Sequence, residues 1–274
     1  MPSLPEYAEL HCVSNFSFLR GASRPEELVE RAASIGYKAL AITDECSLAG
    51  AVRAHIAAKE YSIKLIIGAE FVLTDGMKLV LLATGRQAYG DLSQLITTAR
   101  RRGDKGSYRL DWADVETGAG ECLLLLVPQR ERELEQAQRV ARRFAGQAWI
   151  AAELLCGADD RAQIERLHDV SRACGLPLVA AGDVHMHVRS RRPLQDMLTA
   201  VRLGTTVSGA RHALYPNAER HLRLRMRLAR IYTPELLAET MRIAERCNFS
   251  LASLRYEYPA ELVPAGVVVR VRLL

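Results

Sequence analysis

The chain has 274 residues, of which 49 % are apolar, and this suffices for one large α/β barrel or two modest domains with a buried core. Its N-terminus lacks a basic segment followed by an apolar one, and no window approaches the roughly 18 uncharged apolar residues of a membrane span. Six cysteines are scattered without a C-x-x-C pair, which argues against a disulfide framework and a zinc ribbon. We therefore expect a cytoplasmic globular protein with reduced thiols and no membrane contact.

Positive charge gathers in one part of the chain. The net charge is +5, but between residues 189 and 230 ten arginines stand against two acids, a net +8, so the rest carries −3. Such a segment can follow a phosphate backbone, although a solvated helix face explains the same composition. The candidates for contact with nucleic acid are Arg223, Arg225 and Arg227. Because no base-reading motif accompanies them, we expect any DNA binding to be weak and indifferent to sequence.

Up to about residue 188, short β-branched or leucine-rich runs alternate with longer amphipathic stretches, which is typical of a parallel sheet or a barrel. The runs predict strands at residues 8–13, 39–43, 64–67, 79–83, 123–127, 149–152 and 178–181. The stretches between them predict helices at residues 25–35, 48–61, 89–102, 131–144 and 161–174. Gly36 and Gly175 stand where left-handed helix ends are expected. The glycine-rich stretch 103–120 is expected to form a loop or a short hairpin.

The pattern changes after His187, where strand signals stop. Helices are expected at residues 193–203 and 234–247, the second with Thr233 as N-cap and Pro234 at its first position. We therefore divide the chain into a barrel at residues 1–188 and a helical, arginine-rich connector at residues 189–274.

Metal-binding types of side chain recur directly after the expected strands, and in a (βα) barrel this rim is where active sites are built. His11 closes the first strand, Asp44 the second and Glu70 follows the third, while Asp183 and His185 close the last. One such residue alone is more often a cap or a satisfied polar group, and only the joint pattern favours a site. Imidazole and carboxylate together suit zinc, manganese or iron, often in a multinuclear phosphoesterase centre.

The segments that carry these residues resemble the successive motifs of polymerase-and-histidinol-phosphatase (PHP) domains in bacterial C-family polymerases. They read LHCVSNFSFLRG at 10–21, AITDE at 41–45, IGAE at 67–70 and GDVH at 182–185. Stretches 182–196, 214–222 and 255–259 more narrowly resemble the error-prone, damage-inducible branch. The resemblance runs from about residue 7 to about residue 266, and only 267–274 look unlike the family. It implies an α/β fold, a PHP-type distorted (βα)7 barrel, followed by a smaller, mainly helical segment that leads towards a polymerase palm domain absent from this chain.

Three positions depart from the metal-binding members of that family. The second histidine of their His-x-His motif is Val13 here, the histidine of their Asp-His motif is Glu45, and a further histidine aligns with Lys78. Val13 offers no lone pair, and Lys78 places an ammonium beside the expected metals. Glu45 could still coordinate a harder cation.

By the resemblance, one metal position keeps His11, Glu70 and Asp183, and another keeps only Asp44 and His185. We therefore expect a degraded centre that binds one divalent ion (zinc, manganese or iron) weakly, or none.

The resemblance implies a structural and partner-docking module of an error-prone polymerase that acts in damage-induced translesion synthesis. Its polymerase reaction uses magnesium held by palm aspartates that would follow this chain, so no catalytic residue for polymerisation is expected here. Expected partners are the remainder of the polymerase, DNA and other translesion or replication proteins. The alternatives are an active metal-dependent phosphoesterase or 3′–5′ exonuclease and, on weaker grounds, a small-molecule phosphatase similar to histidinol phosphatase.

Overall fold

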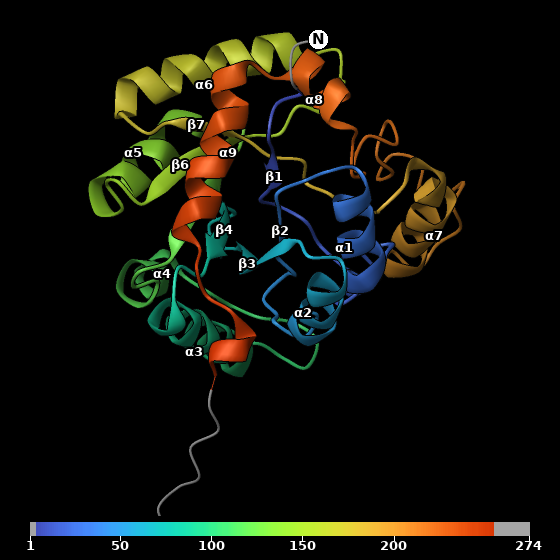
Figure 1. The fold of residues 1–274 in the computed structure, drawn as a ribbon. Helices are drawn as coiled ribbons and strands as arrows, with labels where there is room; N and C mark the ends of the chain where they lie inside the picture. The colour runs from blue at the N-terminus through green and yellow to red at the C-terminus, as the bar shows by residue number, and fades with distance from the viewer. Residues whose placement is uncertain (1–3, 255–274) are drawn as a thin grey trace, which may run out of the picture.

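The computed structural model describes residues 4–254, and its centre is one sheet whose strands follow the order of the chain (Figure 1). All seven expected strands are present, because their runs of buried aliphatic residues suit strands that are covered on both faces. They are β1 (Ala8–Glu9), β2 (Ala39–Ile42), β3 (Lys64–Val72), β4 (Lys78–Leu82), β5 (Leu123–Val127), β6 (Ala148–Ala152) and β7 (Leu178–Ala180). The expected α/β class is confirmed.

The prediction of a parallel sheet is wrong at β4, which pairs antiparallel with both β3 and β5. Only a short turn separates β3 from β4, and it has no room for the crossover helix that a parallel pair requires. Because β4 runs backwards, its first residue, Lys78, pairs with Val72 on β3 and Val127 on β5. Lys78 therefore stands at the rim where the parallel strands end.

The two edges of the sheet meet beyond the ends of β1 and β7. The amide of Val13 donates to the carbonyl of Val184, and the amide of Val184 donates to the carbonyl of His11, each at 2.9 Å. These bonds close the curled sheet into a distorted barrel. They also hold the segment after β1 against the segment after β7.

Helices surround the sheet (Figure 1). The stretch 103–120, expected to be a loop or a short hairpin, contains helix α4 instead, because Asp111 and Asp114 form a capping box and Trp112 and Val115 are buried. Helix α8 was also not expected. The helices are α1 (Pro25–Ser34), α2 (Ala51–Glu60), α3 (Arg86–Arg102), α4 (Trp112–Gly118), α5 (Glu133–Arg143), α6 (Asp160–Cys174), α7 (Arg192–Arg202), α8 (Arg225–Ile231) and α9 (Pro234–Arg246). None in the described residues is long and apolar enough to span a membrane.

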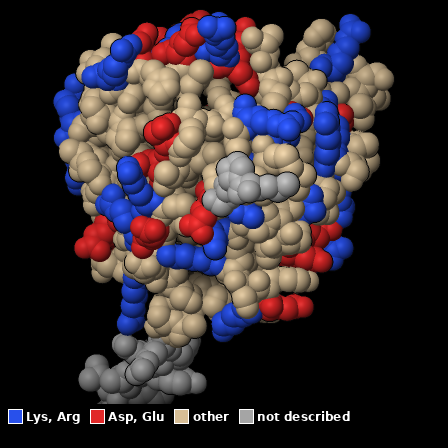
Figure 2. All heavy atoms as spheres, turned by 45° about the horizontal axis from the view of Figure 1, so that its top comes forward, with Lys and Arg blue, Asp and Glu red and all other residues tan. Residues whose placement is uncertain are grey.

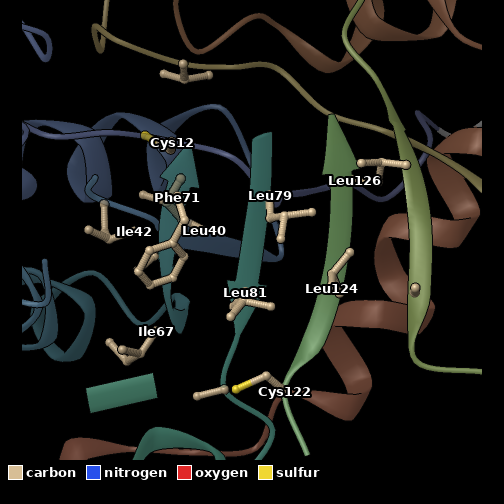
Figure 3. Close-up of a cluster of buried hydrophobic side chains, with 14 of the residues drawn as sticks. Cys12, Leu40, Ile42, Ile67, Phe71, Leu79, Leu81, Cys122, Leu124 and Leu126 are labelled. Atoms are coloured by element: carbon tan, nitrogen blue, oxygen red, sulfur yellow. The ribbon is translucent and has the colours of Figure 1, made fainter. Parts of the chain in front are cut away.

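Alternate strand residues face two apolar layers. Leu79 and Leu81 of β4 face the surrounding helices and pack in the outer layer with Leu124 and Leu126 of β5 (Figure 3). Val80 and Leu82 face inwards, together with residues from all six of the remaining strands. The inner layer is completed by Ile243, Ala244 and Cys247, which belong to α9 or directly follow it.

The connector packs directly on the barrel within the described residues. Thr240 of α9 accepts a hydrogen bond from the amide of Ala8 at 3.1 Å, and the hydroxyl of Tyr232 donates to the carbonyl of Ala181 at 2.9 Å. Leu228 and Leu237 join the outer layer. The part of residues 189–274 that the structure describes therefore shares the core of the barrel.

Candidate metal centre

His11, Glu70 and Asp183 come together at the barrel rim although they are far apart in sequence. Each offers one ligand atom, and these atoms lie within 4.8 Å of one another. Glu70 is on the face of β3 that points into the barrel, and Asp183 continues the inward face of β7. Barrel closure adds His11. By spacing alone, these three side chains could hold one metal ion.

The turn at Asp183 is held in an unusual conformation. The φ angle of Asp183 is +43°, which is uncommon for a residue with a side chain. The preceding amide, of Gly182, donates to Glu9 Oε1 at 2.8 Å, and the amide of His11 donates to the same oxygen at 3.1 Å. The buried carboxylate of Glu9 thus ties together the two segments that present His11 and Asp183.

His11 is held between two carboxylates. Its Nε2 lies 2.7 Å from Glu70 Oε2, and its Nδ1 lies 2.6 Å from Glu153 Oε1. Burial and Lys78 act to lower the pKa of His11, but the two carboxylates outweigh them, so this pKa is raised. With a carboxylate against each nitrogen, the ring has no nitrogen turned towards an open space where a metal could bind.

Glu153 was missed in the sequence, although it obeys the rule that found the other residues. It directly follows β6 and continues the inward face that carries Trp149 and Ala151. Burial acts to raise the pKa of Glu153, but His11 and Lys78 lower it to about 2. Glu153 is therefore a carboxylate at neutral pH.

Three cationic side chains reach the same carboxylates. Lys78 Nζ lies 2.8 Å from Glu70 Oε2 and 3.6 Å from Asp183 Oδ1. Arg20 contacts Glu70 and Glu45, and Arg220 contacts Asp183. Lys78 was singled out by its alignment, whereas Arg20 and Arg220 lie in the stretches 10–21 and 214–222, where the resemblance singled out neither arginine.

These cations decide the charge state of Glu70. Burial acts to raise the pKa of Glu70, but Lys78 and His11 outweigh it and hold that pKa well below its ordinary value. The side chain of Glu70 is fully buried and yet remains ionised, because its partners come from the chain itself.

Two of the expected metal ligands have other partners. Asp44 accepts hydrogen bonds from the amides and hydroxyls of Ser14 and Ser17, at 2.7 to 3.1 Å. It continues the outward face of β2, which explains why it does not join the three residues above. Glu45 pairs with Arg20 and accepts a hydrogen bond from the hydroxyl of Tyr108 at 3.0 Å.

His185 lies beside Asp183, with its Nε2 3.1 Å from Asp183 Oδ1. Burial, followed by the charges of Arg20 and Lys78, lowers the pKa of His185 to about 3. Its ring is therefore neutral, and it packs edge-to-face with the ring of Tyr215.

The residues present do not fit a multinuclear metal centre. Both nitrogens of His11 are engaged, Glu70 and Asp183 are neutralised by Lys78 and two arginines, and Asp44 is held by serines. A second cation would meet three positive charges in a buried space. What remains for a single ion are the carboxylates of Glu70 and Asp183, and the ammonium of Lys78 already contacts both.

The three arginines proposed to contact nucleic acid lie in different surroundings. Arg223 is only 1 % exposed and donates to the carbonyl of Leu154 at 2.8 Å, so the prediction that it contacts DNA is wrong. Arg225 is half-buried against the carbonyls of Ile35 and Pro5. Arg227 is exposed but is paired with Glu219 at 3.0 Å. In the view of Figure 2, basic side chains are interspersed with acidic ones.

Solved structures of low sequence identity share this fold. A protein described as a metal-dependent phosphoesterase from Bifidobacterium adolescentis aligns with a TM-score of 0.51 and 16 % identity, over 68 % of this chain and 89 % of that one. An amidohydrolase from Chromobacterium violaceum, solved with sulfate and no metal, aligns with a TM-score of 0.50 and 18 % identity, over 65 % of this chain and 87 % of that one.

Curated relatives are far more similar in sequence. Error-prone DNA polymerases are 58 % identical in Dechloromonas aromatica, 54 % in an Azoarcus species and 53 % in Pseudomonas aeruginosa. The alignments cover 95 to 96 % of this chain but only 25 to 27 % of the relatives, so the chain spans about a quarter of their length. Residues 9–165 match the PHP domain, and the chain belongs to that family.

Proposed function

We propose that this chain is a structural PHP module of an error-prone DNA polymerase, in which side-chain cations have replaced the metal ions of the barrel rim. The observation that carries the proposal is the position of Lys78, whose ammonium lies between the carboxylates of Glu70 and Asp183. An ammonium neutralises carboxylates as a metal ion does. It offers no vacant coordination position for a substrate or a water molecule.

The rim therefore lacks the means to hydrolyse a phosphodiester. Metal-dependent hydrolysis needs a cation that lowers the pKa of a bound water and stabilises the charge that develops on phosphate. Both ring nitrogens of His11 are held against the carboxylates of Glu70 and Glu153, so neither is free to accept a proton from a water molecule. The same contacts make the rim a stable end to the barrel, which suits a scaffold.

The polymerase context comes from the relatives, of which this chain spans about a quarter. On this proposal the parent protein carries out translesion synthesis after DNA damage, with magnesium bound in a palm domain outside the chain. The barrel supports that domain and docks other translesion or replication proteins. DNA contact by the module itself would be weak and would depend steeply on salt, since no base-reading surface accompanies its exposed arginines.

The competing function is an active phosphoesterase or exonuclease, which is favoured only by the mutual spacing of His11, Glu70 and Asp183. A phosphodiesterase assay with manganese or zinc separates the two. We expect no turnover by the natural chain and a gain in the triple variant Val13→His, Glu45→His, Lys78→His. Robust turnover by the natural chain that Asp183→Ala abolishes would overturn the proposal.

A primer-extension assay tests the claim about polymerisation. With a primed template, magnesium and all four nucleotides, the isolated chain is expected to incorporate no nucleotide. Template-dependent extension by contaminant-free protein would show that a polymerase site lies within these residues.

A further inference from the structure

Helix α7 buries two polar side chains and leaves much of its apolar stripe exposed. Its buried side chains are Gln195, Thr199 and Ala200. Of its larger apolar side chains, Leu194 and Leu198 are half-buried, whereas Met197 and Val201 are 49 % and 57 % exposed. A helix normally buries its apolar stripe, so this arrangement indicates a face that another surface covers.

The loop beside α7 extends the same apolar surface. Phe18 is 82 % exposed, and a cavity of about 310 Å³ lies between this loop and Leu194 and Leu198 of α7. We call the surface formed by Phe18, Leu194, Met197, Leu198 and Val201 the α7 face. Figure 1 shows α7 at the periphery of the fold.

The exposed phenylalanine is on a rigid loop. The amides of Arg20 and Gly21 donate to the carbonyl of Ser17 at 2.9 and 3.1 Å. The amide of Asn15 donates to the carbonyl of Ser23 at 2.8 Å. A Cβ at Gly21 would lie 2.0 Å from the carbonyl oxygen of Ser14, so the loop admits only glycine there. A contact surface that is already ordered loses little entropy when a partner covers it.

The ion pair between Arg20 and the buried carboxylate of Glu70 holds this loop in place. Arg20, two residues after Phe18, pairs with Glu70 in the centre, and its carbonyl accepts a hydrogen bond from Gln195 Nε2 at 2.7 Å. The buried polar side of α7 is thus fastened to the same arginine that neutralises Glu70. The internal ion pairs therefore set the position of Phe18 relative to α7.

We propose that the α7 face is the docking surface for the polymerase portion of the same polypeptide. This rests on the proposed function. About three quarters of the relatives' length lies outside the part matched by this chain, so a large covalently attached partner is available. Exposed Arg24 and Arg202 flank the apolar residues, and the partner surface should therefore be apolar with acidic side chains at its edge.

Site-specific photo-cross-linking tests the assignment. This chain replaces the matching quarter of the Dechloromonas aromatica polymerase, and p-benzoylphenylalanine is placed at Val201 or, as control, at Leu134 of α5. Leu134 is also apolar and is 42 % exposed, but α5 lies on the opposite side of the fold (Figure 1). We expect intramolecular cross-links to the polymerase portion from position 201 and none from position 134.

Binding between separately produced pieces gives a second readout that does not need the chimera to fold. Val201→Glu and Met197→Glu should weaken association of the chain with the polymerase portion by at least about tenfold, and Leu134→Glu should leave it unchanged. Absence of a contact in both formats overturns the assignment. So does a dimer of this chain that Val201→Glu abolishes, because the covering surface would then be a second copy.

Failure of this inference differs from failure of the proposed function. Suppose that the chimera with the unmodified chain extends primers, but that position 201 forms no cross-link and Val201→Glu does not weaken binding. The chain is then still a scaffold, and only the assignment of the α7 face as the docking surface is wrong. If the unmodified chain hydrolyses phosphodiesters, the proposed function fails whatever the cross-links show.

Discussion

Lys78 Nζ lies 2.8 Å from Glu70 Oε2, and this contact joins the first residue of β4 to the inward face of β3. It exists because β4 runs antiparallel to its neighbours, which brings the start of that strand to the rim where the others end. A parallel fourth strand would have placed residue 78 at the opposite end of the barrel.

Removing the ammonium should destabilise the fold. Lys78→Met keeps most of the side-chain volume but leaves Glu70 with a buried charge that has lost its nearest lysine. Lys78 is 20 % exposed, so we expect a loss of about 3 kcal/mol, the lower end for a broken buried pair. Lys38→Met is the matched control, because its pair with Glu6 is more than half exposed and should contribute below about 0.5 kcal/mol. Equal losses in denaturant titrations of the two variants would contradict the role of Lys78.

Acid should weaken the same network. The pKa of Glu153 is lowered in the fold from its ordinary value of 4.5 to about 2, so its contribution to stability is present above 4.5 and is lost as the pH falls towards 2. The unfolding free energy should therefore fall steeply across that interval, and Glu153→Gln should flatten the fall. Glu135→Gln, at an exposed carboxylate paired with Arg132, is the control. An unchanged slope in Glu153→Gln would show that the carboxyl is not held ionised by His11.

The sequence predicted the strands better than the site. Strand positions were predictable because runs such as LLLLV at 123–127 leave few alternatives, whereas the direction of β4 depended on the length of one turn. Glu70 and Asp183 were found because both lie on the inward face near the ends of strands, although β3 runs on to Val72 and therefore contains Glu70 instead of ending before it. Asp44 also follows a strand, but it continues the outward face. Counting the alternation of inward and outward residues along β2 as far as Asp44 would have shown that this side chain points away from the inward-facing acids.

The cations of the centre were harder to predict than its acids. Arg20 lies in an irregular loop, where no periodicity predicts which way a side chain points, and Arg220 lies in a segment rich in arginines, where nothing in the sequence distinguishes it from the others. Their roles arise from tertiary contacts with Glu70 and Asp183.

Glycine should be required at position 182. A Cβ there would lie 2.3 Å from Glu9 Oε2, the carboxylate that fixes the turn before Asp183. Gly182→Ala should cost about 1–3 kcal/mol, since the crowded carboxylate is buried and cannot move into solvent. Gly90→Ala, in α3 with nothing within 4 Å of the added atom, should instead stabilise by about 0.5–1 kcal/mol. Calorimetric melts of both variants check the sign of each effect.

Replacing Arg223 should lower the stability of the fold and leave its affinity for DNA unchanged. Arg223→Met removes a buried donor to the carbonyl of Leu154, and a loss of roughly 2 kcal/mol is expected. The exposed Arg230→Met should leave the melting temperature unchanged. If the folded Arg223→Met variant showed a flatter salt dependence in DNA-binding titrations, its guanidinium would have to reach phosphate, contrary to its burial.

The central claim is that side-chain cations stand where metals would bind, and metal content combined with thermal melting tests it most directly. Protein purified without chelator should contain far less than one equivalent of zinc, manganese or iron. Its melting temperature should be the same with EDTA, with added zinc and with added manganese. An ion that bound only the folded state would raise the melting temperature. The triple variant Val13→His, Glu45→His, Lys78→His should retain metal and melt higher when metal is added. One or more tightly held ions per natural chain, with a melting temperature that falls when EDTA removes them, would contradict the account.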